Sequence, residues 1–410
     1  MPLDIWTLQI AETLPFDSGT RKMRTALLSQ ELARRGHRVL WWTSAFNHAK
    51  KDWLAQDGES RDLMPGVKLR FLKGCGYTRN VSPKRFIDHR MVARKFAEAA
   101  AQLHPPDVIV ASMPTYDLSY QAYLLAKKHN IPFILDVRDK WPDTFTQHLP
   151  APLRLAADLM LSGDRKMLRE QCRGADSVVS MMNGLLGWAQ KLGGRPESPA
   201  DRVFLLGETR PPEEDTPNIL DIPYGKFVVA FIGTFGTHSS PEVLLKAAKR
   251  LQYRDDILFV LAGDGNFFGE IKRRAKDLPN LRLPGWLNRA QMYALLSRSH
   301  AGVVSGTAKA EAFPNKAFVY LSMGLPLLSD SDGELRAFME QERTGLHYPL
   351  NDEAALADRI LKLKENAALR AEMSANARRI FLDRMDAEKI YAAYADHVEK
   401  VAARRGGKLK

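Results

Sequence analysis

The alternation of two kinds of segment constrains the fold of this chain more than any other sequence feature. Short apolar runs alternate with longer stretches whose apolar residues recur at helical spacing. In the first half, strands are predicted at 3–9, 38–43, 67–71, 108–111, 133–137, 177–180 and 203–206. Helices are predicted between some of them, at 21–35, 86–103 and 116–129. Because strands that are separated by helices usually pair in parallel, the pattern predicts an α/β fold.

Residues 207–225 interrupt this alternation, with four prolines, several acidic residues and little apolar periodicity. The pattern then restarts, with strands predicted at 227–232, 257–262, 281–283, 301–304 and 326–328. Further helices are predicted at 241–251, 267–278, 289–298, 333–340, 353–364, 366–380 and 386–404. The sequence therefore predicts two doubly wound, Rossmann-like domains at 1–206 and 226–385, joined by a linker at 207–225. Since ligands of such sheets bind at the carboxyl ends of the strands, we expect a central cleft that both domains face.

Composition places the chain among ordinary globular proteins, with 45% hydrophobic and 26% charged residues. Its two cysteines, Cys75 and Cys172, cannot form a disulfide framework, so a reducing, cytoplasmic compartment is expected. The first ten residues lack the basic start and the cleavage site of a signal peptide. No run approaches the roughly 18 apolar residues that span a bilayer. We therefore expect a soluble or peripheral protein.

The net charge of +12 is concentrated in the first half, where residues 1–210 hold 31 Lys and Arg against 22 Asp and Glu. A basic excess is typical of proteins that bind nucleic acid, anionic lipid or phosphorylated substrates. No zinc-finger, RNP or helix-turn-helix pattern accompanies it, so nucleic acid is not expected as a partner. Two interpretations stay open: contact with the inner face of an anionic membrane, or a solvated basic surface without a partner.

The stretch from Glu311 to Leu328 carries the strongest functional signal, because a polar loop leads into a helix that ends near Gly324 and then into a short apolar strand. A helix N-terminus with Asn315 and Lys316 is suited to a diphosphate, and the Glu311 carboxylate is suited to a sugar hydroxyl. The alternative for Lys316 is a solvated lysine near the helix cap.

Two glycine-containing turns follow predicted strands of the second half. Glycines let backbone N–H groups approach a phosphate, which makes the turn after 227–232 a candidate for a phosphate-binding site. A second turn follows 257–262, and it is equally typical of an ordinary strand-to-helix connection. The candidate residues are Gly233, Thr234, Phe235, Gly236, Gly263 and Asp264.

In the first half, polar residues directly follow the predicted strand 133–137. We predict that Arg138 and Asp139 face the cleft and contact its ligand, which the resemblance described below implies is the sugar or the acceptor. The alternative is an Arg–Asp pair that only fixes the loop. For Trp141, packing is favoured over stacking on a sugar ring. A single glycine, Gly19, lies in the loop before the first helix, where it could approach the donor phosphates or serve only as part of a helix cap.

These motifs resemble those of the retaining family-4 glycosyltransferases of GT-B fold. The resemblance rests on Glu311 to Pro326, on the glycine turns after 227–232 and 257–262, and on the segment 32–39. Arg138-Asp139-x-Trp141-Pro142 is similar to the version found in members that build bacterial surface polysaccharides. The family's second glutamate, which usually holds the ribose hydroxyls, falls on Val319. An arginine and a lysine common in the glycine loop are replaced by Thr234 and by Ser239 or Ser240.

The resemblance implies a donor, an acceptor and a mechanism. The donor would be a nucleoside-diphosphate sugar, the acceptor a glycan or a polyprenyl-linked saccharide, and transfer would proceed with retention and without a metal or other cofactor. Gly285 and Trp286 would meet the nucleobase edge, Glu311 the sugar hydroxyls and Lys316 the leaving diphosphate. The helix at 386–404 would pack back on the first domain.

Two other functions stay open. A catalytically impaired GT-B protein could act as a scaffold or partner subunit, because Val319 cannot hydrogen-bond a ribose. A sugar-nucleotide epimerase could use the same fold. A metal site is not expected, since the ten histidines show no His-x-x-x-His pair and the two cysteines lie far apart in the sequence.

Overall fold

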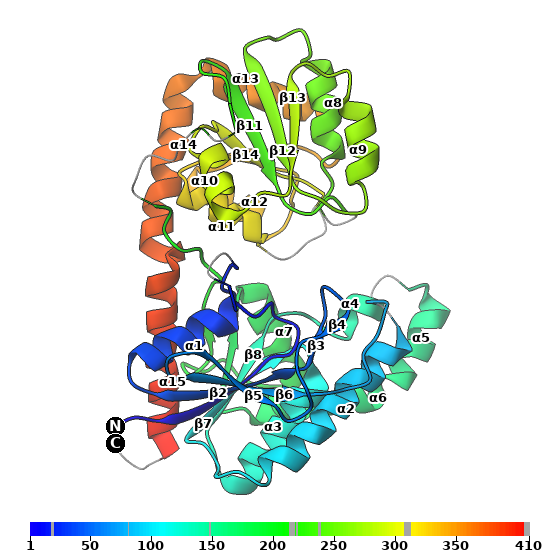
Figure 1. The fold of residues 1–410 in the computed structure, drawn as a ribbon, viewed down its shortest axis with the longest axis vertical. Coiled ribbons are helices and arrows are strands. Elements are labelled where there is room, and N and C mark those ends of the chain that lie inside the picture. The colour runs from blue at the N-terminus through cyan, green and yellow to red at the C-terminus, as the bar shows by residue number, and fades with distance from the viewer. Residues whose placement is uncertain are drawn as a thin grey trace. The chain divides into compact units, whose positions relative to one another are not determined.

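A computed structural model describes residues 1–17, 20–80, 82–146, 149–212, 218, 220–236, 239–306 and 313–405. The chain divides into two compact units, which are here named unit 1 and unit 2. Unit 1 contains Met1–Leu206 and the chain from Ile390 onward, and unit 2 contains Gly207–Lys389. Each unit is built around its own mainly parallel sheet flanked by helices (Figure 1). None of the helices among the described residues combines the length and the apolar character that a bilayer crossing requires.

The sheet of unit 1 has the strand order β10-β9-β8-β7-β1-β2-β6-β5. All neighbours are parallel except β5, which runs antiparallel to β6 at one edge. Its strands are β1 (Asp4–Leu8), β2 (Arg38–Ser44), β5 (Ser60–Met64), β6 (Val67–Leu72), β7 (Val108–Met113), β8 (Phe133–Val137), β9 (Ser177–Ser180) and β10 (Arg202–Val203). A separate short pair is formed by β3 (Phe46–Asn47) and β4 (Asp52–Trp53).

The helices of unit 1 pack on a core that includes Trp6, Trp42 and Phe96, whose rings meet edge to face. Such aromatic contacts add to the burial of the rings themselves. The helices are α1 (Arg24–Arg34), α2 (Pro83–Ala100), α3 (Tyr116–His129), α4 (Asp143–Thr146), α5 (Ala151–Met160), α6 (Ser162–Gly174), α7 (Asn183–Gly193) and α15 (Ala387–Arg405). The last of these enters unit 1 at Ile390.

The sheet of unit 2 is parallel throughout, in the order β13-β12-β11-β14-β15-β16. Its strands are β11 (Phe227–Ile232), β12 (Ile257–Ala262), β13 (Leu281–Gly285), β14 (Ala301–Val304), β15 (Leu327–Ser329) and β16 (Gly345–His347). Its helices are α8 (Glu242–Arg250), α9 (Phe268–Ala275), α10 (Arg289–Leu296), α11 (Asn315–Ser322), α12 (Glu334–Glu342), α13 (Glu353–Glu365) and α14 (Ala367–Ile380), followed by a π-helical turn, η1 (Phe381–Met385).

The predicted fold class is confirmed, and several elements have the predicted bounds. The strands at 133–137, 177–180, 227–232, 257–262 and 301–304 and the helix at 116–129 are examples. The predicted strand at 203–206 is only β10, Arg202–Val203. The elements that were not predicted include the short, polar edge strand β5, the short strand β16 and the helices α4 to α7.

A buried ion pair joins the elements of unit 1 at the carboxyl ends of its strands. Arg24, the first residue of α1, donates from Nε and Nη2 to the carboxylate of Asp136 on β8, at 2.9–3.1 Å. Both side chains are almost fully buried. Arg24 also donates to the carbonyl oxygen of Phe204 and lies 5.0 Å from the ring centroid of Tyr394 on α15. One guanidinium thus holds α1, β8, the segment after β10 and α15 together.

Asp136→Ala should destabilise unit 1 strongly, because it leaves the buried charge of Arg24 without a partner. We expect the free energy of unfolding to fall by about 3–5 kcal/mol, measured by urea denaturation with circular dichroism. Arg38→Ala is the control, because its pair with Asp4 is exposed and should contribute less than about 1 kcal/mol. An equal effect of the two substitutions would contradict the assigned role of the buried pair.

Candidate functional site

Lys316 lies over the carboxyl end of β11 in unit 2. Its ammonium donates a hydrogen bond to Ser239 Oγ at 2.7 Å and lies 3.8 Å from the ring centroid of Phe231. A Cβ added to Gly233 would come within 3.2 Å of the Lys316 Nζ atom. Any larger residue at position 233 would therefore press on the ammonium, and glycine lets the lysine lie flat against the end of the strand.

Burial lowers the pKa of Lys316 to about 7, and the nearby carboxylate of Asp330 opposes this shift. Among the described residues, no carboxylate lies within ion-pair distance of Lys316. Among the described residues, the partners of the ammonium are therefore a hydroxyl and an aromatic face, with no carboxylate at ion-pair distance. An anion that bound here would restore the positive charge of the lysine, because an opposite charge favours the protonated form.

The N-terminus of α11 adds partial positive charge next to the Lys316 ammonium. Pro314 precedes the helix and gives no side-chain cap, and the N–H groups of Asn315 and Lys316 have no acceptor within the described part of the chain. The first N–H groups of a helix point outward and carry partial positive charge. Together with Lys316 they form the kind of corner in which proteins bind phosphate groups.

The two predicted glycine turns pack backbone to backbone. Gly263 has φ +158°, and a Cβ on it would collide with the carbonyl oxygen of Gly233. Gly265 has φ +147°, and its Cβ would lie 2.6 Å from the carbonyl oxygen of Phe235. Only glycine at positions 263 and 265 allows the two turns to approach this closely. This contact fixes the position of the first turn relative to the end of β11.

Most N–H groups of the first turn are used within the protein. Gly233 donates to the Ala262 carbonyl at 3.0 Å, Phe235 to the Asp264 carbonyl at 2.9 Å, and Gly236 to the Ser239 carbonyl at 3.3 Å. In the described residues, the N–H of Thr234 has no such acceptor, and its side chain is exposed. Among the described residues, the N–H of Thr234 is therefore the one in this turn that has no acceptor within the protein. Phe235 is fully buried, so only its backbone could take part.

The remaining candidates of unit 2 lie around these turns. Asp264 is exposed, and its carboxylate accepts the N–H of Gly265 at 2.7 Å, as in a turn. The carbonyl of Gly285 accepts the N–H of Gly263 at 2.8 Å, which brings the end of β13 beside the second turn. The side chain of Trp286 is 67% exposed. Val319 is buried in α11, at 4% exposure.

Sequence reasoning missed two polar groups near this edge of the sheet, Asp330 after β15 and Tyr320 on α11. Asp330 directly follows β15 and accepts the N–H of Gly306 at 2.8 Å. The hydroxyl of Tyr320 accepts the N–H of Ile232 at 2.9 Å, below the turn. The signal that could have found Asp330 is its position, because polar residues that directly follow buried parallel strands gather at one edge of a sheet.

In unit 1, Arg138 joins the buried Arg24–Asp136 pair. It donates to Asp136 at 2.9 Å, to Glu12 at 2.8 Å and to the hydroxyl of Thr25 at 2.9 Å. The same Glu12 carboxylate accepts N–H groups of Thr25 and Ala26 at the start of α1. A carboxylate thus already occupies this helix N-terminus and would repel a phosphate there.

Asp139 and Trp141 form the turn that follows. Asp139 accepts hydrogen bonds from the Lys140 N–H, the Thr144 hydroxyl and the Trp141 indole, at 2.7–3.1 Å. Trp141 is buried against Phe145, with 4.7 Å between the ring centroids, so its predicted packing is confirmed. The contacts of Arg138 and Asp139 are those of the loop-fixing alternative, and their role toward a sugar or an acceptor stays a prediction.

Two predicted residues, Gly19 and Glu311, lie outside the described residues. Within the residues that the structure does describe, no group of three or more His, Cys, Asp or Glu side chains is arranged to hold a metal ion.

Comparison with known families assigns both halves of the chain. Residues 21–203 match a family model described as a Glycosyl transferase 4-like domain. Residues 212–380 match a second model, described as Glycosyl transferases group 1. The two matches therefore cover the central parts of units 1 and 2.

Two curated relatives are similar to part of the chain. One is the O-antigen chain mannosyltransferase C of Escherichia coli, 27% identical over 169 residues, or 40% of this chain and 44% of the relative. The other is the lipopolysaccharide core biosynthesis glycosyltransferase LpsD of Rhizobium meliloti (strain 1021), 26% identical over 189 residues, or 45% and 53%. The matches thus span about half the length of these relatives.

Three solved structures show the same fold at low sequence identity. Sucrose-phosphate synthase from Thermosynechococcus elongatus has a TM-score of 0.73 at 15% identity, covering 98% of this chain and 99% of that one. HepE of Anabaena, solved in complex with UDP, has a TM-score of 0.68 at 16% identity, and the match covers 98% of this chain and 100% of HepE. WaaG, a glycosyltransferase involved in lipopolysaccharide biosynthesis, has a TM-score of 0.65 at 14% identity, and the match covers 96% of this chain and 99% of WaaG. These likenesses establish the GT-B fold.

Gly263→Ala should disrupt the two packed turns, because its Cβ would collide with the Gly233 carbonyl and its φ is unfavourable for alanine. We expect a loss of about 1–3 kcal/mol in the stability of unit 2, measured by thermal unfolding. Gly269→Ala is the matched control, since nothing lies within 4 Å of its Cβ and it is part of α9. Alanine there should be neutral or stabilising. Equal melting temperatures for the two variants would contradict this packing.

Proposed function

Because the chain belongs to the GT-B glycosyltransferases, with a Glycosyl transferase 4-like domain followed by a Glycosyl transferases group 1 domain, we propose that it transfers a sugar from a nucleoside-diphosphate sugar to a glycan or polyprenyl-linked acceptor. The observation that carries this proposal is the placement of Lys316. Its ammonium lies at the carboxyl end of β11, beside the uncapped N-terminus of α11, and lacks a carboxylate partner in the described residues.

The proposed chemistry is electrostatic. As the bond between the sugar and the diphosphate breaks, negative charge builds up on the leaving phosphate, and a positive group that is already in place lowers the barrier. Lys316 supplies that charge, and the N–H groups of Asn315 and Thr234 supply hydrogen bonds. No nucleophilic side chain is required for this role.

Retention, the sugar contacts and the base contacts are also proposed. The acceptor hydroxyl attacks the anomeric carbon from the face that the diphosphate leaves, and its proton passes to the departing phosphate. Glu311 holds the sugar hydroxyls, and Gly285 and Trp286 meet the nucleobase. Neither a metal nor another cofactor takes part. The buried Val319 cannot hold the ribose, so the ribose must be held by another group or only weakly. The anomeric configuration of the product, read by NMR, tests retention, and an inverted product would refute it.

The names of similar proteins support surface-polysaccharide synthesis as the setting. One curated relative is named as an O-antigen mannosyltransferase and the other as a lipopolysaccharide core glycosyltransferase. HepE, a structural neighbour, was solved with UDP and with UDP-glucose. We propose that this chain acts in the cytoplasm, on an acceptor of bacterial surface-polysaccharide assembly.

Lys316→Ala should weaken the binding of the preferred nucleotide sugar about ten- to a hundredfold, because a charge-assisted hydrogen bond contributes about 1.5–3 kcal/mol. A panel of UDP-, GDP-, TDP- and CMP-sugars, screened by thermal shift, identifies that ligand, and calorimetry gives its affinity. Lys276→Ala, a change of an exposed lysine in unit 2, is the control and should bind normally.

The same interaction predicts a pH dependence. Because the pKa of Lys316 is about 7 in the free protein and rises when a diphosphate binds, the affinity should fall as the pH increases from 7 to 8. A nucleotide sugar is used because it has no terminal phosphate, whose own pKa is about 6. Lys316→Arg should remove the dependence, since arginine stays charged. No binding to any nucleotide sugar, with a folded protein, would instead favour the non-catalytic alternative.

Contact with an anionic membrane is a further part of the proposal, and helix α5 of unit 1 supports it. None of its residues is buried, and its large apolar side chains are 58% exposed at Leu153, 74% at Leu155, 76% at Leu159 and 85% at Met160. Figure 1 shows α5 at the outer end of unit 1. The exposed cations Lys166 and Arg169 follow on α6. Apolar residues next to cations are suited to the interface of an anionic bilayer.

Leu155→Ser with Leu159→Ser should lower binding to vesicles containing phosphatidylglycerol at least tenfold, because each leucine that is buried in the lipid interface contributes about 1.5–3 kcal/mol. Flotation at physiological salt measures this. Leu103→Ser with Leu124→Ser is the control, since both leucines are exposed elsewhere on unit 1. Equal flotation of both variants, or none of the unaltered protein, would refute the membrane role of α5.

A further inference from the structure

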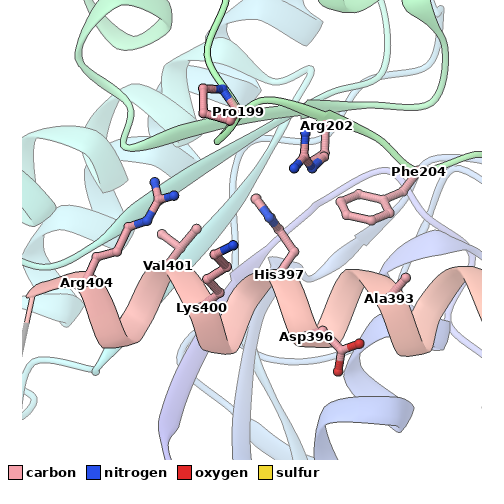
Figure 2. A pocket seen from close by; sticks show the side chains of 9 residues that line it. All are labelled: Pro199, Arg202, Phe204, Ala393, Asp396, His397, Lys400, Val401 and Arg404. Carbon is pink, nitrogen blue, oxygen red and sulfur yellow. The ribbon is translucent and has the colours of Figure 1, made fainter. Parts of the chain in front are cut away.

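A small hollow in unit 1 lies between β10 and the last helix, α15. It measures about 230 Å³ and is lined by Pro199, Arg202, Phe204, Ala393, Asp396, His397, Lys400, Val401 and Arg404. In Figure 2, the side chains of His397, Lys400 and Arg404 extend from α15 toward Pro199 and Arg202. Sites for drug-sized ligands usually measure 300–1,000 Å³, so this one is suited to a single small group.

Three cations around the hollow lack a counter-charge. Arg202, Lys400 and Arg404 are exposed, and none of them forms an ion pair or a side-chain hydrogen bond within the part of the chain that the structure describes. They come from two elements, β10 and α15, so their mutual repulsion acts against the packing of the helix on the sheet edge.

The neighbouring acidic groups are engaged elsewhere. Asp396 accepts a hydrogen bond from Arg35 Nη1 at 2.5 Å and points away from the hollow in Figure 2. Asp201 accepts from the guanidinium of Arg195 at 2.8–2.9 Å and from the N–H of Val178 at 2.9 Å. These carboxylates therefore do not neutralise the three cations.

The buried imidazole of His397 provides an independent observation. The residue is only 8% exposed, and its Nε2 lies 2.8 Å from Ser177 Oγ. That hydroxyl donates its own proton to the carbonyl of Ala200 at 2.6 Å, so Nε2 must be the donor to Ser177 and Nδ1 carries the lone pair. Nδ1 has no partner among the described residues, and Figure 2 shows the ring pointing toward Arg202.

We propose that this hollow is an oxyanion site for a phosphate-class group, held by Arg202, Lys400 and Arg404 and by His397 once Nδ1 is protonated. Arginine and lysine are the usual partners of phosphate oxygens. The bound group would bridge β10 and α15 and relieve the repulsion between them. The site would therefore fix the last helix on unit 1, which is a role separate from sugar transfer.

Binding should take up a proton. Burial and the charges of Arg202, Arg404 and Lys400 lower the pKa of His397 to about 4, while Asp201 opposes the shift, so the ring is neutral at pH 7. An anion in the hollow offsets the three cations and raises the pKa of His397. The affinity should therefore rise as the pH falls from 8 to 6.

The test uses the full chain with sodium sulfate, which does not titrate in this range, and with sodium phosphate, at constant ionic strength set by chloride. Calorimetry should show one site, with proton uptake revealed by buffers of different ionisation enthalpy. Arg202→Ala with Lys400→Ala should weaken binding at least tenfold. Lys128→Ala with Lys191→Ala removes the same charge from other exposed positions of unit 1 and should bind normally.

Equal binding by the two double variants, or no binding of the unaltered chain to any of the free anions or to the vesicles, would overturn the proposal. Glycerol 3-phosphate and phosphatidylglycerol vesicles show whether the bound phosphate group belongs to a soluble molecule or to a lipid. Saturation by the free anion assigns a soluble phosphate, whereas binding to vesicles alone, lost in Arg202→Ala with Lys400→Ala, assigns a lipid head group. Nucleotide-sugar binding should be unchanged in both variants, which separates this site from the proposed donor site.

Discussion

The buried guanidinium of Arg24 is the interaction on which unit 1 depends. Its carboxylate partner, Asp136, is at the carboxyl end of β8, and its other contacts reach the segment after β10 and the ring of Tyr394 on α15. A buried charge is tolerated only when it is fully paired, so the elements that supply its partners cannot move apart independently. Arg138 and Glu12 extend the same network to the start of α1. The carboxyl edge of this sheet is therefore rigid and closed by ion pairs.

The corresponding edge of unit 2 is organised in the opposite way. There, Gly233 and Gly263 allow backbone contact between two turns, and among the described residues no carboxylate lies at ion-pair distance from Lys316. Lys316 rests on this surface with a hydroxyl and an aromatic ring as partners. The two sheet edges therefore differ in their ability to bind an anion. A cation at a helix N-terminus that has no carboxylate partner in the described residues attracts an anion, whereas a closed network of ion pairs does not.

Some elements could be predicted from the sequence and others could not. The strand at 133–137 is apolar except for Asp136 and was predicted with its observed bounds, as was the strand at 227–232. In contrast, β5 is polar and mostly exposed, so it lacks the apolar pattern that burial imposes on a strand. At the site, Lys316 was found because it opens a helix after a polar loop. Asp330 was missed because its relevance depends on which strands are neighbours.

The sequence by itself determined the α/β class and the chemistry available at each strand end, since these follow from apolar periodicity and residue type. Only the tertiary structure decided which polar groups are paired. It engages Arg138 with Asp136 and Glu12, leaves Lys316 without a carboxylate in the described residues, and brings Arg202 beside His397 and Lys400 although nearly two hundred residues separate them. The physical reason is that the strength of a charge depends on its neighbours and its exposure to water, and the fold sets both.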